Sequence, residues 1–96
     1  MLVVRVTVGE RVRVGDRVLT LLRVQRPGVA VVQLDNGERF GVIWDRKVEV
    51  LPRVFLTADR KKSYYDTINL LFKAPVSINI GVLRHEPEPS ERHEDG

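Results

Sequence analysis

The chain has 96 residues, with 16 Lys and Arg against 13 Asp and Glu and a formal net charge of +3. It contains no cysteine, which excludes disulfide bonds and thiolate metal sites. No apolar run approaches the roughly 20 residues of a membrane span, and Met1 leads directly into an alternating pattern, so we expect no membrane helix, no signal peptide and a cytoplasmic location.

Residues 1–46 alternate between apolar and polar side chains with a period of two. Val4 and Val6 alternate with Arg5 and Thr7, which is typical of a strand with one buried face and one wet face. Gly, Asn and Pro residues interrupt the alternation at short intervals and suit tight turns. The pattern predicts an antiparallel meander of five short strands, at residues 4–8, 11–14, 18–26, 29–34 and 40–44.

The second half is less regular but also favours strands. Residues 48–57 predict a strand in which Pro52 forces a bend, an edge position or a bulge, and residues 59–66 predict a polar loop. Two further strands are predicted at residues 67–72 and 77–83. No segment has the pattern of an amphipathic helix. We therefore expect an all-β fold, a small antiparallel meander or barrel-like sheet of short strands.

Charge is distributed unevenly along the chain. Five of the 13 acidic side chains but only one of the 16 basic ones lie in residues 85–96, so residues 1–84 carry a net charge of +7. A body this basic favours polyanionic partners such as nucleic acid, although a solvated basic surface is the alternative. Residues 87–96 have no apolar side chain to bury and are predicted to form a disordered acidic tail.

Motifs at both ends of the chain resemble the carbon storage regulator (CsrA/RsmE) family. Met1-Leu2-Val3-Val4, then Val8-Gly9-Glu10 and Val14-Gly15-Asp16, follow the spacing of the family's amino terminus. Leu71-Phe72-Lys73-Ala74-Pro75, then a strand, then Arg84-His85-Glu86, resemble its ending. The resemblance covers residues 1–86 and requires an internal extension, or a partial repeat, around residues 47–66.

That resemblance implies a bacterial translational regulator that binds RNA. It implies a homodimer with exchanged strands, whose joint edge holds a single-stranded GGA-containing loop of an mRNA leader or a small regulatory RNA. The residues that the resemblance carries to the RNA edge are Val4, Arg5, Ile78, Ile80, Arg84 and Glu86.

Other candidate RNA-binding residues come from side-chain chemistry. Arg11 and Arg13 form a basic stripe on one predicted strand, and solvated strand arginines are the alternative. Cations beside aromatics suit backbone neutralisation plus base stacking, although a loop with one tyrosine packed on the sheet is the alternative. These residues are Arg60, Lys61, Lys62 and Tyr64, followed by Tyr65. Trp44 is expected in the core or at an interface, with base stacking as its alternative.

Chemistry beyond binding has little support in the sequence. There is no nucleophile–base spacing, no Gly-rich phosphate loop and no paired carboxylates, so we expect no enzyme and no cofactor. His85 and His93 are too isolated to predict a metal site. Two other functions stay open: a protein-interaction module derived from the family, or an SH3-like or KOW-like small barrel in translation or transcription.

Overall fold

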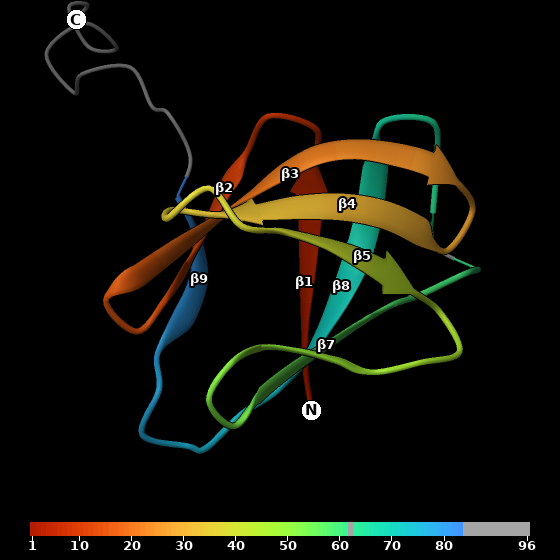
Figure 1. The fold of residues 1–96 in the computed structure, drawn as a ribbon. Coiled ribbons are helices and arrows are strands. Elements are labelled where there is room, and N and C mark those ends of the chain that lie inside the picture. The colour runs from red at the N-terminus through yellow and green to blue at the C-terminus, as the bar shows by residue number, and fades with distance from the viewer. Residues whose placement is uncertain (62, 84–96) are drawn as a thin grey trace, which may run out of the picture.

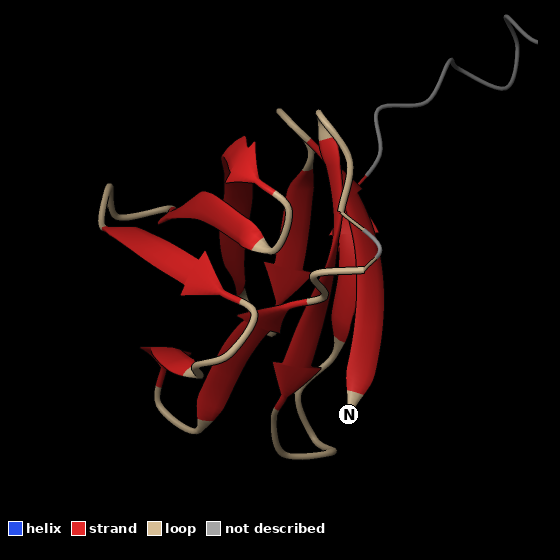
Figure 2. Ribbon diagram, turned by 90° about the vertical axis from the view of Figure 1, so that its right-hand side faces the viewer, coloured by secondary structure: helices blue, strands red, loops and turns tan. Residues whose placement is uncertain are grey.

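The computed structural model describes residues 1–61 and 63–83, which form nine strands in two antiparallel sheets (Figure 1). Sheet A contains, in spatial order, β1 (Leu2–Thr7), β8 (Thr67–Lys73), β7 (Val54–Ala58) and β6 (Val48–Leu51). Sheet B contains β5 (Arg39–Ile43), β4 (Val29–Leu34), β3 (Arg17–Arg26), β2 (Arg11–Val14) and β9 (Ile80–Leu83). Over these residues there are only strands and loops (Figure 2), which confirms the predicted all-β class. Both sheets stay open, and no helix that could cross a membrane occurs in this part of the chain.

Sheet B is built mainly from neighbouring hairpins. Strands β2 to β5 follow one another in sequence and in space, and β9 pairs with the free side of β2. The β3–β4 connection is the two-residue turn Pro27-Gly28, in which Gly28 has a φ of +80°. Proline followed by a residue with positive φ is the preferred sequence of a type II turn, so the local sequence dictates this hairpin.

The first strand does not belong to the meander that the sequence predicts. β1 pairs along its whole length with β8, from Leu2 opposite Phe72 to Thr7 opposite Thr67, and so lies in sheet A. The chain crosses to sheet B at residues 8–10, where the Val8 N–H donates to the Asp66 carbonyl and the Gly9 N–H to the Leu21 carbonyl. The meander of sheet B therefore has four consecutive strands rather than five.

Two further predictions require correction. Residues 48–57 form a hairpin rather than one bent strand, because Pro52-Arg53 makes a two-residue turn between β6 and β7. The last strand begins at Ile80 rather than at residue 77, because the Ile78 N–H closes a turn onto the Pro75 carbonyl.

The core lies between the two sheets, whose strands cross, as Figure 1 shows for β3 and β4 in front of β1 and β8. It consists of aliphatic side chains from alternate positions of both sheets, together with Phe72, which is 1% exposed. Trp44 is not part of this core, contrary to one of the two placements expected for it: it follows β5 and is 44% exposed. β-branched and leucine side chains fill a sheet-to-sheet interface well, so the alternating pattern is sufficient to build this core.

Candidate nucleic-acid interface

The strands of sheet B carry cations and no acidic side chain. β2, β3, β4, β5 and β9 together contain six arginines and neither Asp nor Glu. Of the carboxylates near this sheet, Glu10, Asp16, Asp35 and Glu38 lie in the turns at the ends of its strands. The outer face of sheet B is therefore positively charged across its width.

Strand register places four of these arginines on the outer face. Residues directly opposite each other in antiparallel strands point to the same side of the sheet. One row crosses all five strands, in the order Leu83, Arg11, Thr20, Gln33 and Arg39. Arg13 lies in the next row beside Val18 and Gly81, and Arg23 lies opposite Val31. We call Arg11, Arg13, Arg23 and Arg39, all exposed, the arginine face.

An irregularity in β3 brings Arg23 to this face. Leu21 is buried and pairs with Val32, whereas Arg23 pairs with Val31, so one extra residue separates the two pairs. Without that extra residue, Arg23 would have the same orientation as Leu21 and would point into the core. The bulge thus converts an inward position into an outward one.

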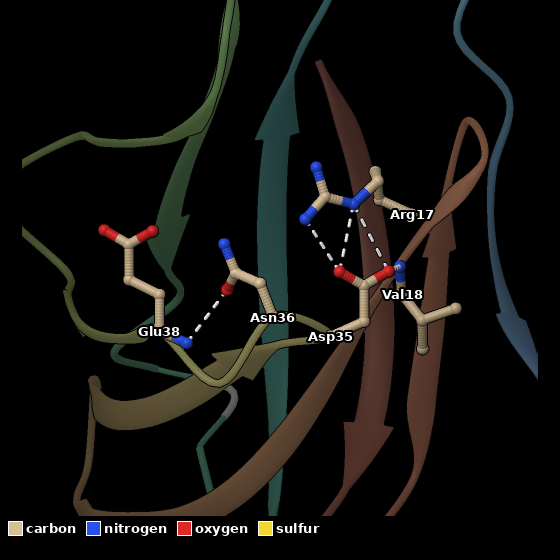
Figure 3. A network of polar contacts seen from close by, with 5 residues as sticks. All are labelled: Arg17, Val18, Asp35, Asn36 and Glu38. Carbon is tan, nitrogen blue, oxygen red and sulfur yellow. Dashed lines mark hydrogen bonds and ion pairs between the residues drawn. The ribbon is translucent and has the colours of Figure 1, made fainter.

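The ion pair between Arg17 and Asp35 anchors one margin of sheet B. The guanidinium donates to the carboxylate at 2.7 Å from Nη2 and 2.9 Å from Nε, and the Val18 N–H donates to the same carboxylate at 3.1 Å (Figure 3). The hydrogen bonds that Arg17 donates lower the pKa of Asp35, and the same hydrogen bonds raise the pKa of Arg17. This carboxylate is thus already neutralised locally.

No other salt bridge occurs within residues 1–61 and 63–83. Among the side chains of the arginine face, Arg39 donates from Nε to the Gln33 Oε1 at 2.9 Å, which is a contact to a neutral amide. Within the described chain, therefore, no carboxylate forms a salt bridge with any of the four arginines. Exposed guanidinium groups in such an array suit phosphate, which they bind in a bidentate manner.

The outer side of sheet A pairs cations with aromatic rings instead. Arg5 lies 5.4 Å from the ring centre of Tyr64, and Lys47 lies 5.4 Å from that of Phe55. The Arg60 guanidinium lies 4.6 Å from the ring centre of Trp44. These distances are within the range of cation–π attraction, so the rings occupy part of the surface of each cation.

The predicted site residues are thus divided between two sides of the molecule. Arg11 and Arg13 belong to the outer face of sheet B, whereas Arg5, Arg60, Lys61 and Tyr64 lie on sheet A and its β7–β8 connection. Tyr64 is 58% exposed but lies against Arg5, and Tyr65, at 94%, is almost free of contacts.

Three apolar candidates do not offer exposed side chains to RNA. Val4 is a core residue, so its predicted role cannot involve its side chain. Ile78 and Ile80 are partly buried against the core.

Some predicted residues lie outside the described part of the chain. These are Lys62, Arg84, Glu86 and the predicted tail at residues 87–96.

Sequence reasoning missed Arg23 and Arg39. Arg39 could have been predicted, because the alternation of its strand places Val42 inward and Arg39 outward. Arg23 could not have been predicted, because its orientation depends on the bulge. Within the described residues, no three His, Cys, Asp or Glu side chains gather as a metal site.

No protein-family model matches the chain, and comparison with curated proteins and with solved structures gives no significant match.

Proposed function

We propose that this protein binds single-stranded RNA through the arginine face and controls translation of a bacterial message in the cytoplasm. The observation that carries the proposal is the charge pattern of sheet B: six arginines and no acidic side chain on five adjacent strands. The role is one of binding rather than catalysis. The resemblance of the two chain ends to the carbon storage regulator family supports RNA as the polyanion, and GGA-containing loops as the preferred sequence.

An arginine face on an open sheet suits unpaired RNA better than a duplex. The major groove of an RNA helix is deep and narrow, so side chains on an open sheet cannot read it. A single strand can lie across the sheet with its phosphates on the guanidinium groups and its bases turned outward or stacked on them. Gly41 and Gly81 have nothing within 4 Å of where a Cβ would lie, so no side chain blocks this approach there.

The test compares two triple variants with the same change in charge. Arg11→Ala/Arg13→Ala/Arg23→Ala removes three cations from the arginine face, and Arg5→Ala/Lys47→Ala/Lys73→Ala removes three from the outer side of sheet A. Binding of a labelled RNA hairpin with a GGA-containing loop is followed by anisotropy. We expect the first variant to weaken binding about 10- to 100-fold, roughly 0.5–1 kcal/mol for each exposed contact.

Salt dependence separates a local contact from a general charge effect. For a single strand, each phosphate that a cation neutralises adds about 0.7 to the slope of log K against log salt, so the slope of the first variant should be smaller by about 2. Equally weakened binding in both variants would contradict an arginine face as the site. Equal binding of a hairpin with a scrambled loop would contradict GGA preference and leave general RNA binding in place.

The proposal includes a homodimer formed through strand pairing. β1 is the edge strand of sheet A and pairs only with β8 in the described chain, so its other side has backbone groups available for a partner strand. Met1, Leu2 and Val3 are exposed along this edge. Light scattering at tens of micromolar is expected to give twice the chain mass, and a stable monomer would refute the dimer.

One observation favours a protein-interaction module as the second candidate. A groove of 290 Å³ at the start of β1 is lined largely by apolar side chains, among them Met1, Leu2 and Val76, which are all exposed. Exposed apolar groups that line a groove are typical of protein interfaces. Failure of the protein to bind any RNA, together with capture of a defined protein partner that Leu2→Asp abolishes, would make this the better interpretation.

A further inference from the structure

A cleft beside Trp44 is not explained by the arginine face. It has a volume of 510 Å³ and is lined by Trp44, Ala58, Asp59, Arg60, Lys61 and Leu71. Ligand pockets in proteins are about 300–1,000 Å³, so this cleft is large enough for one small planar group. It combines an indole, two cations and a carboxylate.

Trp44 is fixed in position and still exposed. A Cβ built on Gly28 would lie 2.7 Å from Trp44 Cδ1 and 3.1 Å from the Arg60 Cα, so the β3–β4 turn packs directly against both residues. Arg60 covers part of the ring, yet 44% of Trp44 remains accessible. An aromatic ring that is held rigidly at the surface is suited to stacking, because little side-chain entropy is lost on binding.

The strand edge beside the cleft has backbone groups without a strand partner. β6 pairs with β7 only as far as Leu56, so on that side Thr57 and Ala58 have no neighbouring strand among the described residues. The Asp59 carboxylate accepts the Lys61 N–H at 3.0 Å, which fixes the start of the loop. Strand-edge N–H and C=O groups can pair with the edge of a base.

We propose that the Trp44 cleft holds one unpaired base of an RNA whose backbone lies on the arginine face. The β3–β4 turn connects the two sites, since β3 carries Arg23 and Arg26 and ends at the Pro27-Gly28 turn, which packs against Trp44 and Arg60. The base stacks on the exposed part of the indole, and Arg60 and Lys61 attract the adjacent phosphates. This inference rests on the proposed function and adds the site that contacts a base.

Trp44 is the only tryptophan in the chain, so its fluorescence reports on the cleft alone. The experiment titrates the protein with a short single-stranded RNA, with the same strand made abasic, and with inorganic polyphosphate. We expect RNA to quench the emission, and the two ligands without bases to bind through charge and leave it nearly unchanged. Equal quenching by polyphosphate, or RNA binding without quenching, would overturn the cleft as a base site.

Substitutions separate this inference from the proposed function. Trp44→Ala should weaken RNA binding about 5- to 150-fold, the range for removal of one base–aromatic stack, while Trp44→Phe should retain most of the affinity. Phe55→Ala is the matched control, since Phe55 also lies against a cation, Lys47, but does not line the cleft. Thermal unfolding by circular dichroism checks that each variant is folded.

Each outcome leads to a different conclusion. If Trp44→Ala is folded and binds RNA like the wild type, while substitutions on the arginine face weaken binding, the cleft inference fails and the proposed function stands. If Trp44→Ala does not fold, Trp44→Phe and the abasic strand still decide the matter. If neither RNA nor polyphosphate binds the wild-type protein, both the proposed function and the cleft inference fail.

Discussion

Sheet A and sheet B contribute the same kind of side chain to their shared core and differ in what they show to solvent. The strands of sheet B contain six arginines and no acidic residue, whereas those of sheet A contain Arg5, Lys73 and Glu49. Three cations on or near sheet A, namely Arg5, Lys47 and Arg60, lie against aromatic rings. The strands of sheet B therefore carry arginines with no acidic side chain among them, whereas most of the other described cations lie in loops.

The two sheets are alike in how far apart their paired strands are in sequence. In sheet B, β2 to β5 are joined by short turns, and only β9 comes from a distance. In sheet A, β1 pairs with β8, so residues far apart in the sequence must meet. Pairs of high sequence separation form slowly and depend on the rest of the fold, and each sheet has one such pairing, β1–β8 in sheet A and β2–β9 in sheet B.

The largest effect on stability should come from a residue of sheet A that lies in the core between the two sheets. Phe72 is the bulkiest fully buried side chain, and Phe72→Ala should lower the free energy of unfolding by about 3–5 kcal/mol. Urea unfolding followed by Trp44 fluorescence and by circular dichroism measures this decrease. Phe72→Leu, which retains most of the volume, should cost less than about 1.5 kcal/mol.

The same measurement tests whether the sheets can unfold separately. Leu21→Ala removes an equally buried side chain from sheet B and should cost about 2–5 kcal/mol. Both variants should unfold in one transition, because one core serves both sheets. Two separate transitions in either variant would show that the sheets are independent units.

The next largest effect compares two turns of sheet B that both have positive φ. Gly28 and Gly37 have φ values of +80° and +93°, but only Gly28 has neighbours that a Cβ would meet. Gly28→Ala should cost about 2–4 kcal/mol, from backbone strain plus the collision with Trp44, and Gly37→Ala about 1–2 kcal/mol from strain alone. Thermal unfolding measures both costs. Equal destabilisation would mean that Trp44 moves aside for the added methyl group at little cost in free energy.

Strand positions were more predictable than strand partners. β4 has the bounds that the alternation predicted, and β3 and β8 differ from prediction by one residue at one end. A period of two and a tight turn are local properties, so sequence specifies them. The partner of β1 is not local: its alternation fits the core equally well beside β2 or beside β8, and packing in three dimensions selects β8.

The candidate site was predictable only in part, for the same reason. Arg11 and Arg13 lie on a regular strand, so their outward orientation follows from the burial of Val12 and Val14. The orientation of Arg23 depends on a bulge, which reverses the face of the residues that follow it until the second register shift, between Val24 and Arg26. The Trp44 cleft depends on Gly28 and Arg60, which are 32 residues apart in the sequence, and no local pattern brings them together.

A smaller effect is expected at the one non-glycine residue of the described chain with positive φ. Arg53 has a φ of +66° in the β6–β7 turn of sheet A, where the hairpins of sheet B use glycine. Arg53→Gly should stabilise the protein by about 0.5–1 kcal/mol, because relief of strain exceeds the added freedom of the unfolded chain. The Arg53 N–H to Glu49 hydrogen bond is retained, since it comes from the backbone.

Arg53→Ala is the matched control for that substitution. It removes the same charge and side chain but keeps the Cβ, so it should leave the melting temperature nearly unchanged. Stabilisation by both variants would assign the effect to charge rather than to backbone conformation.

The smallest effect should be a pH dependence at the margin of sheet B. The pKa of Asp35 is lowered by its hydrogen bond to Arg17, so the folded protein binds a proton there less readily than the unfolded chain does. The contribution of Asp35 is therefore fully present above its ordinary pKa of about 3.9 and is lost as the pH falls through the lowered folded pKa. Asp35→Asn should lower the melting temperature slightly at pH 6, and the difference from wild type should shrink as the pH falls below about 4. Both residues are more than one-third exposed, so salt should also reduce the difference.

Asp16→Asn, which removes the same charge from the adjacent turn without an Arg17 hydrogen bond, is the control. A difference between Asp35→Asn and wild type that stays constant down to pH 2.5 would show that the charge of Asp35 is not what stabilises the turn.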